Sequence, residues 1–261
     1  MKINPTYSKA KKIKAEYPIF LFNNFLNKKT CNLLYKEIKN LTNYDDIVMN
    51  GRHRVNKGSK TFKKSLKKSP HLSKLYNSLN SLKSYRKIKR ILLNKSTPKG
   101  FQPILREQLF SKDSYGEQKF NLFDYIKKTK LVSSFLKDEI NLDMDFSKSK
   151  RGYFRNAHRD RDTRVISFLL YLNTINKKDG GQFEVYKTKQ FSKNPKTFSR
   201  FPNKKEVIKT NKFPPVSGQM FIFLSTPNSY HGVSEFTAKN KERVFIYGSY
   251  SLNKKVEWLI N

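Results

Sequence analysis

Cysteine is nearly absent from this 261-residue sequence, in which Cys31 is the single example. One thiol cannot build a disulfide framework within the chain, which excludes the small disulfide-stapled folds and favours a reducing compartment. Long apolar runs are also missing, because the longest, residues 165–172, is far short of the ~20 residues that span a bilayer. The basic start of the chain lacks the apolar segment of a secretory signal. These absences predict a soluble, cytoplasmic protein without a membrane partner.

Acidic side chains are scarce, since 20 Asp and Glu stand against 55 Lys and Arg and the formal net charge is +35. Such a charge attracts phosphate groups, so an anionic partner, nucleic acid included, is one interpretation. The other is compositional, because lysine outnumbers arginine and Asn, Ile, Phe and Tyr are abundant, as AT-rich codons would supply. The basic residues are spread along the chain instead of forming one block, which favours the compositional interpretation.

Apolar residues are sufficient for a core, at 36% of the chain with 14% aromatic residues. Residues 17–26 are typical of a short buried strand that runs into a turn. Asn27 is placed to cap a following helix. One face of that helix is marked by apolar residues at helical spacing, namely Cys31, Leu34, Ile38 and Leu41.

A second helical region follows a polar stretch. Residues 51–68 are basic and poor in apolar anchors, which predicts a mobile loop. Ser69 then offers an N-cap and Pro70 a first-turn proline, and residues 81–93 are expected to continue the helical pattern. The N-terminal part, residues 1–100, is therefore predicted to be mainly helical.

Beyond residue 100 the hydrophobic period changes from helical to two. Short runs rich in Phe, Ile, Val and Tyr alternate with Gly, Pro and Asn, which is typical of antiparallel strands. They lie at residues 165–172, 182–186, 220–224 and 243–250. Residues 187–215 are polar and lysine-rich, and we expect them to form a long excursion from the rim. The sequence predicts an α+β fold in which residues 101–261 form a β-sandwich or barrel core, within one domain over 1–261.

The stretch NAHRDRD contains two competing motifs. His158, Arg159 and Asp160 spell the HRD of a protein-kinase catalytic loop, but that loop needs an Asn five residues after the Asp. Here that position is Val165, and the chain has neither a G-x-G-x-x-G nor a DFG sequence. The kinase interpretation therefore fails.

His158 and Asp160 also form a His-x-Asp pair, which opens the facial triad of mononuclear iron sites when a distant histidine joins it. Three candidates remain for that histidine: His53 and His71 in the helical part, and His231 directly after the strand-like MFIFL. The strand context favours His231. A surface pair in an arginine-rich turn is the alternative interpretation of the His-x-Asp motif.

Arg243 begins a strand of apolar residues, where an arginine is unusual. A guanidinium inside a barrel is costly without an anion, and a carboxylate is a partner that its rigid fork can bind. The alternation of a strand puts Arg243, Phe245, Tyr247 and Ser249 on one face, and Val244, Ile246, Gly248 and Tyr250 on the other.

Five blocks in order resemble a known family: GYFRNAHRD, VISFLLYLN, DGGQFEVYK, PPVSGQMFIFLSTPNSYHGV and ERVFIYGSYS. The sequence resembles the iron(II)- and 2-oxoglutarate-dependent dioxygenases, in their prolyl 4-hydroxylase-like branch. The resemblance covers about residues 151–251, and residues 17–34 look like the family's N-terminal strand and helix. It implies a double-stranded β-helix, the cupin-like jelly roll, with the N-terminal helices packed against it.

The resemblance also implies the site residues. His158, Asp160 and His231 look like the metal ligands and hence the catalytic centre, and Arg243 resembles the residue that pairs with the distal carboxylate of 2-oxoglutarate. Tyr171 resembles a tyrosine that assists there, although an aromatic core residue is the alternative. The glycines Gly180, Gly181 and Gly218 match the family's tight turns.

The activity implied is that of a non-haem Fe(II)- and 2-oxoglutarate-dependent dioxygenase that uses O2, releases succinate and CO2 and hydroxylates its substrate. Ascorbate is a further cofactor that the resemblance allows. The halogenases related to this family lack the carboxylate at the position of Asp160, which favours hydroxylation. The expected substrate is a small molecule or a peptide, and its identity is left open because rim loops decide it.

Two alternative functions belong to other classes. A nucleic-acid demethylase of the same superfamily would suit the charge, but the pattern R-x-N-x-T-x-R is not present after Arg243. A non-catalytic jelly-roll binding protein would lack a metal ligand, whereas all three are present. Five arginines around the motif could bind an anionic substrate or be solvated rim charge: Arg151, Arg155, Arg159, Arg161 and Arg164.

Overall fold

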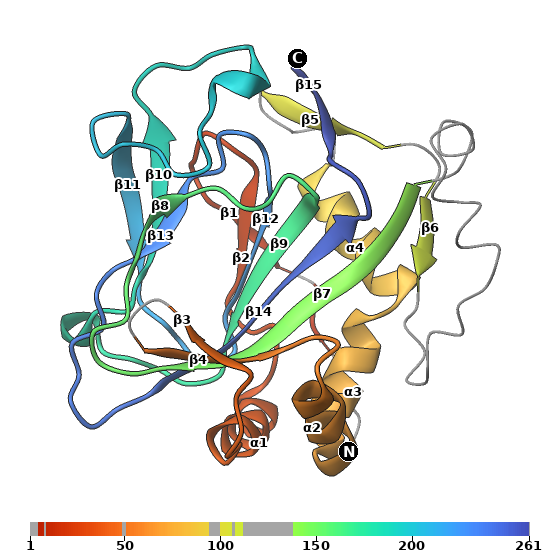
Figure 1. Cartoon of the computed structure of the whole chain (residues 1–261), viewed down its shortest axis with the longest axis vertical. Coiled ribbons are helices and arrows are strands. Elements are labelled where there is room, and N and C mark those ends of the chain that lie inside the picture. Colours follow the sequence, from red (N-terminus) through yellow and green to blue (C-terminus); the bar gives the residue numbers. More distant parts are fainter. Residues whose placement is uncertain are drawn as a thin grey trace.

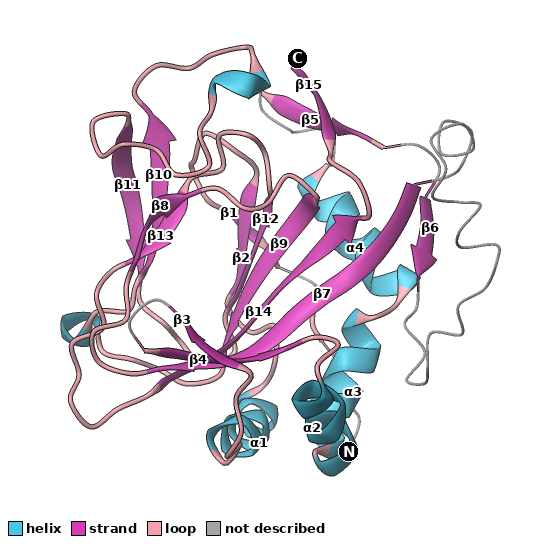
Figure 2. Cartoon of the chain, in the orientation of Figure 1, coloured by secondary structure: helices cyan, strands magenta, loops and turns pink. Residues whose placement is uncertain are grey.

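A computed structural model describes residues 5–7, 9–48, 51–93, 100–105, 108–111 and 138–260. In these parts four α-helices pack against antiparallel sheets, which is the expected α+β class (Figures 1 and 2). Residues 112–137 belong to the predicted jelly-roll core but lie outside the described residues. None of the helices described is long and apolar enough to cross a bilayer.

The large sheet has nine strands and receives strands from both ends of the chain. In spatial order they are β1 (Lys11–Lys12), β2 (Ile19–Phe22), β12 (Met220–Leu224), β9 (Arg164–Tyr171), β14 (Arg243–Leu252), β7 (Asp138–Ser149), β4 (Arg52–Asn56) and β3 (Asp46–Val48), and β6 (Gln108–Ser111) pairs with β7 in parallel. The long strand β14 lies between β7 and β9 at the centre of the sheet (Figure 1).

A smaller sheet faces it. Its order is β11 (Val207–Phe213), β10 (Phe183–Thr188), β13 (His231–Val233) and β8 (Arg155–His158). A separate pair joins β15 (Glu257–Ile260) to β5 (Phe101–Ile104), and two 3-10 turns lie at Lys177–Asp179 and Pro195–Thr197. The two main sheets enclose a shared apolar layer and form the predicted jelly roll.

Alternation along each strand divides the core into two layers. On β12, Phe221 and Phe223 enter the layer between the sheets, while Met220 and Ile222 face the helices. Because both faces of this strand are covered, all five of its residues are buried, which explains the uninterrupted apolar run MFIFL. The face assignment predicted for β14 is confirmed by the same division, since Phe245 joins the inner layer.

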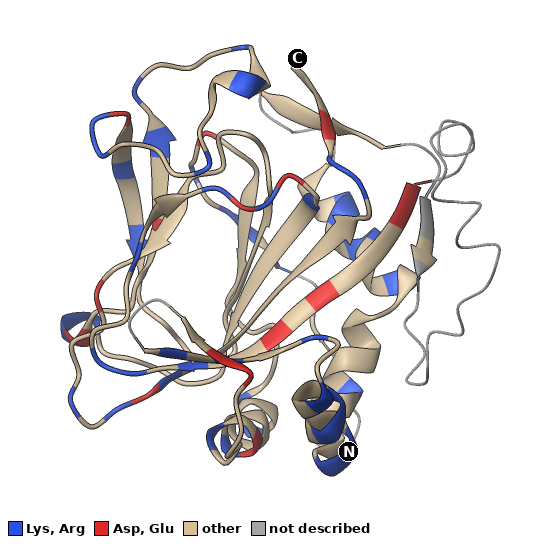
Figure 3. Ribbon diagram, viewed as in Figure 1, with Lys and Arg blue, Asp and Glu red and all other residues tan. Residues whose placement is uncertain are grey.

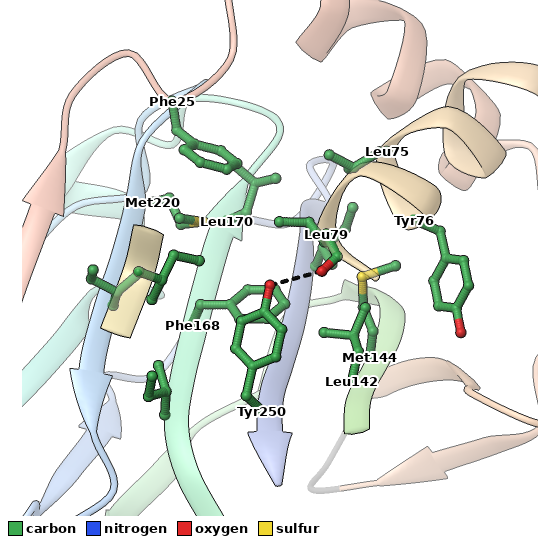
Figure 4. Packing of buried hydrophobic residues seen from close by; sticks show 14 of the residues in the cluster. Phe25, Leu75, Tyr76, Leu79, Leu142, Met144, Phe168, Leu170, Met220 and Tyr250 are labelled. Carbon is green, nitrogen blue, oxygen red and sulfur yellow. Dashed lines mark hydrogen bonds between the residues drawn. The ribbon is translucent and has the colours of Figure 1, made fainter. Parts of the chain in front are cut away.

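The helices cover the outer face of the large sheet. They are α1 (Lys28–Lys39), α2 (Lys60–Lys68), α3 (Pro70–Leu79) and α4 (Leu82–Leu92). Figure 4 shows Leu75 and Leu79 of α3 packed among Phe168, Met144 and Tyr250 of the sheet. The helices therefore cover one face of the large sheet, and its other face points toward the smaller sheet and the site.

Helix capping agrees with the sequence in part. The predicted cap at Asn27 is confirmed, since its Oδ1 accepts the backbone N–H of Thr30 at 2.8 Å. Pro70 occupies the first turn of α3 as predicted, but Ser69 makes no side-chain capping hydrogen bond there. At the preceding helix, α2, the N-cap is Ser59, whose hydroxyl oxygen accepts the backbone N–H of Phe62 at 2.9 Å.

Two predictions of irregular structure are wrong. Residues 51–68 contain β4 and α2, anchored by the buried side chains of Val55, Phe62 and Leu66, so the segment is not a loop. The excursion at 187–215 is also shorter than predicted, because β11 pairs with β10. The N-terminal part contains the expected helices but also contributes β1 to β4 to the large sheet.

Candidate metal centre and active site

Neighbouring strands bring His158, Asp160 and His231 together. His158 ends β8 and His231 begins β13, and the two are directly paired across these antiparallel strands. Asp160 follows in the turn after β8. One potential ligand atom from each of the three side chains lies within 4.8 Å of the others, and all three residues are buried. The structure therefore assembles the three side chains that the sequence singled out.

Both imidazoles are oriented by the backbone. Nδ1 of His158 lies 2.9 Å from the carbonyl oxygen of Asn156, and Nδ1 of His231 lies 2.9 Å from that of Ser229. Because a carbonyl only accepts, each Nδ1 carries the proton and donates it, which leaves each Nε2 unprotonated with its lone pair directed into the site. Such backbone contacts are the usual way in which metal-binding histidines are held.

Burial keeps the two histidines neutral. It lowers the pKa of His158 well below its usual range, and the nearby His231 and Arg155 lower that pKa further. The pKa of His231 is also lowered by burial, against the opposing effect of Asp160. Neutral imidazole is the form that binds metal ions.

Asp160 is ionised by its surroundings. Burial raises its pKa, but Arg164 and the two histidines outweigh burial and hold the pKa well below its usual range. Nη1 of Arg164 donates to Oδ1 at 2.9 Å. Ser167 and Tyr247 donate hydroxyl hydrogen bonds to Oδ2 at 2.5 and 2.6 Å. Two neutral imidazoles and one carboxylate are a donor set that fits Fe(II).

Ser167 and Tyr247 are functional candidates that sequence reasoning missed. A period of two was the available signal, because Ser167 shares a strand face with Tyr171 and Tyr247 shares one with Arg243. Recognising that each of these faces continues into the site was possible only once the register between β9 and β14 was known.

Arg243 is fully buried, with 0% of its surface exposed, in the inner layer. Its Nη2 donates to the hydroxyl of Tyr171 at 3.2 Å, and the rings of Phe245 and Tyr171 lie 4.2 and 5.0 Å from its guanidinium carbon. Its Nε and Nη1 have no hydrogen-bond partner among the described residues. A buried cation with free donors requires an anion, so this group is suited to a carboxylate ligand.

A glycine makes room for this arginine. Gly181 has a φ of +65°, and a Cβ at this position would lie 3.0 Å from Cδ of Arg243 and 3.3 Å from the ring of Phe236. A side chain here would be strained in itself and would crowd the guanidinium. The predicted tight turn at Gly180 and Gly181 is therefore also a packing requirement of the site.

One cavity of about 580 Å³ joins the triad to Arg243. The triad, Arg243 and Tyr247 line it, together with a basic set of Arg52, Arg54, Arg155, Arg161 and Arg200. A volume of this size is within the range of small-molecule sites.

The other two histidines lie elsewhere. Nδ1 of His71 on α3 is 2.6 Å from Oε1 of Glu37 on α1, and the ring of His53 on β4 packs against Tyr44. Within the described residues, the group of His, Cys, Asp and Glu with metal-binding geometry is His158, Asp160 and His231. The strand-based choice of His231 over the alternatives agrees with this placement.

The five arginines around the motif divide into different roles. Arg164 pairs with Asp160, and Arg159 pairs with Asp162. Arg155 and Arg161 line the cavity, whereas the remaining one, Arg151, is exposed outside its lining. The group is therefore not a single anion-binding rim.

The β-rich part of the chain matches a known family. Residues 144–250 match the family model described as the 2OG-Fe(II) oxygenase superfamily. This part of the chain is therefore similar to members of that superfamily. Such a match implies Fe(II), 2-oxoglutarate and O2 as cofactor and co-substrates, and the triad and Arg243 fit them.

Solved structures support the oxygenase fold. A prolyl-4-hydroxylase from Pseudomonas putida superposes with a TM-score of 0.50 at 15% identity, covering 92% of this chain and 95% of that one. SnoK, a non-heme alpha ketoglutarate dependent carbocyclase from nogalamycin biosynthesis, superposes with a TM-score of 0.51 at 10% identity, covering 94% and 84%. Among curated proteins no relative matches the sequence. At these identities the likeness concerns the fold and not the substrate.

Proposed function

We propose that this oxygenase is a hydroxylase in which His158, Asp160 and His231 hold Fe(II), and Arg243 with Tyr171 binds the distal carboxylate of 2-oxoglutarate. The observation that carries the proposal is the coincidence of two features in one cavity. A buried triad of two neutral imidazoles and a carboxylate lies there beside a buried arginine with unpartnered donors.

The protein's own residues position the reactants. The backbone carbonyls of Asn156 and Ser229 turn each Nε2 toward the site, and the hydroxyl of Tyr247 fixes the carboxylate of Asp160. Arg243 supplies a rigid, water-free fork for a carboxylate. When bound, Fe(II) and 2-oxoglutarate supply the oxidising chemistry, in which O2 converts 2-oxoglutarate to succinate and CO2 and inserts one oxygen atom into a substrate C–H bond.

Details of the site favour hydroxylation over the alternatives. The carboxylate of Asp160 occupies the position that would have to be vacant for a halide. The presence of all three candidate metal ligands, together with the unpartnered donors of Arg243, argues against a binding protein without catalysis. A nucleic-acid demethylase is disfavoured because β14 continues from Arg243 as VFIYGSY, without the second arginine.

The metal assignment is tested by anaerobic Fe(II) titration of four alanine variants. His158→Ala, Asp160→Ala and His231→Ala should each lose Fe(II) affinity and 2-oxoglutarate turnover to succinate while remaining folded. His53→Ala is the matched control and should retain both. Unchanged Fe(II) affinity in the three site variants would remove the proposal.

The role of Arg243 is tested separately. Arg243→Ala should weaken 2-oxoglutarate by about 10- to 150-fold and spare Fe(II), because it removes one charge-assisted contact and no metal ligand. Arg243→Lys should recover part of the affinity, since lysine restores the charge without the planar fork. Equal 2-oxoglutarate affinity in Arg243→Ala and the parent would show that another base has this role.

A further inference from the structure

Residues 199–201, in the segment between β10 and β11, are held beside the cavity by hydrogen bonds. The backbone N–H of Arg159 donates to the carbonyl of Arg200 at 3.0 Å, and the hydroxyl of Tyr230 donates to the carbonyl of Ser199 at 2.7 Å. These bonds tie the segment to the strand ends that carry the triad. As a result the side chains of Arg200 and Phe201 line the cavity beside His158 and His231.

Arg200 has no counter-ion among the residues that the structure describes. Its Nε is buried without a hydrogen-bond partner in the described parts of the chain, and its guanidinium carbon lies 5.0 Å from the ring of Phe201. An enclosed donor of a charged group is costly to leave unsatisfied. It is therefore available to a ligand that enters the cavity.

Arg155 reaches the same cavity from β8. Its Nε donates to Nε2 of His158 at 3.1 Å, the atom that would bind the metal. In the metal-loaded site Arg155 would have to give up this acceptor.

Several other cations of the cavity have partners within the protein. Three of them form ion pairs: Arg52 with Asp145 at 2.6 Å, Arg54 with Asp46 at 2.6 Å and Arg164 with Asp160 at 2.9 Å. Arg155, Arg161 and Arg200 differ because none of them has such a pair among the described residues. Of these three, Arg200 has a buried Nε without a partner and Arg155 contacts the proposed metal ligand His158. They also differ from Arg243, which is enclosed deeper in the inner layer.

We infer that Arg155 and Arg200 bind an anionic group, a phosphate or a carboxylate, of a small-molecule substrate. The inference rests on the proposed function for the position of the metal and adds the chemical class of the substrate. Two guanidiniums that line one cavity can both donate to the oxygens of one such group. The cavity of about 580 Å³ has room for a small molecule beside 2-oxoglutarate.

The test compares anionic and neutral probes of one shape by calorimetric titration. Phenyl phosphate, phenylacetate and benzyl alcohol are added to protein that contains 2-oxoglutarate and Zn(II), a metal without redox chemistry. We expect at least one anion to bind about 10-fold or more tightly than benzyl alcohol. The tighter of the two anions identifies the group as phosphate or carboxylate.

Matched variants locate the binding. Arg155→Gln and Arg200→Gln should each weaken the anion by about 10-fold or more, since each removes a charge-assisted contact. Arg151→Gln makes the same change of charge outside the cavity lining and should leave the affinity unchanged. If Arg155→Gln does not fold, Arg200→Gln with Arg200→Lys still decides, because lysine should restore part of the affinity.

Failure of the inference can be separated from failure of the proposed function. The titrations are repeated in Arg243→Ala without metal or 2-oxoglutarate, where the anion cannot occupy the carboxylate site of Arg243. Anion affinity that is unaffected by Arg155→Gln and Arg200→Gln in both backgrounds overturns the inference. The small-molecule assignment is overturned if neither small anion binds but a single-stranded oligonucleotide does, and if that binding is weakened by both Arg155→Gln and Arg200→Gln.

Discussion

Hydrogen bonds to Asp160 are the residue-scale feature through which the proposed metal centre can be tested. Tyr247→Phe removes the hydroxyl that donates to Oδ2 at 2.6 Å and leaves the ring in place. We expect Fe(II) affinity to fall by about 10- to 100-fold, the range typical of residues that orient metal ligands. Anaerobic titration with Fe(II) measures this change directly.

Tyr250 supplies the matched control from the opposite face of β14. Its hydroxyl donates to the carbonyl of Leu79 at 2.8 Å, in the layer under the helices (Figure 4). Tyr250→Phe should lower the free energy of unfolding by about 1 to 2 kcal/mol and leave Fe(II) affinity unchanged. Equal effects of the two substitutions on Fe(II) would mean that Tyr247 acts only through general stability.

The space beside Arg243 allows a second prediction. Gly181→Ala places a side chain at a φ of +65° and against the arginine, whereas Gly58→Ala meets a similar φ of +86° with nothing within 4 Å. Both should cost roughly 1 kcal/mol or more of unfolding free energy. Only Gly181→Ala should also weaken 2-oxoglutarate, which a titration of the metal-loaded variants would detect. A weakened co-substrate in both would contradict the crowding argument.

Helix termini provide the prediction at the scale of elements, because two serines flank α2 with different contacts. Ser59→Ala removes the cap on the N–H of Phe62 and should cost about 1 kcal/mol in urea unfolding. Ser69→Ala should be close to neutral, since this side chain makes no capping hydrogen bond to α3. A larger loss at Ser69 than at Ser59 would refute the assignment of the cap.

Elements with a strong period were predictable, and elements that depend on distant partners were not. The faces of β14 and the cap at Asn27 follow from local patterns, as does the choice of His231. Residues 51–68 contain too few apolar residues to reveal β4 and α2, because Val55 and Phe62 find their partners on a strand about 90 residues later. Likewise, the contact of Tyr247 with Asp160 depends on the register between strands, which cannot be read from the sequence.

Charge is the feature that belongs to the whole molecule. Lysine and arginine are distributed over helices, strands and loops in Figure 3. We therefore expect single-stranded oligonucleotides to bind without sequence preference and to dissociate as salt rises. Contact with 6 to 10 phosphates would cost about 10³- to 10⁵-fold in affinity between 50 and 200 mM salt. Fluorescence anisotropy measures this slope.

The contrary result would be a sequence preference that persists at high salt. It would require base contacts in place of counterion release and would revive a nucleic-acid function. Arg155→Gln should not alter the salt slope measurably, because one cation among 55 contributes little to a dispersed surface charge.

The position of β14 has a consequence for synthesis of the protein on the ribosome. This strand joins β7 to β9, so until residue 252 has emerged the large sheet exists as two pieces, each with an open edge of unpaired backbone groups. The triad is already synthesised at that stage, but Arg243 and Tyr247 arrive with β14 itself. Closure of the sheet and arrival of the residues proposed to bind the co-substrate are therefore one event, and a nascent chain released before it exposes its apolar layers to aggregation.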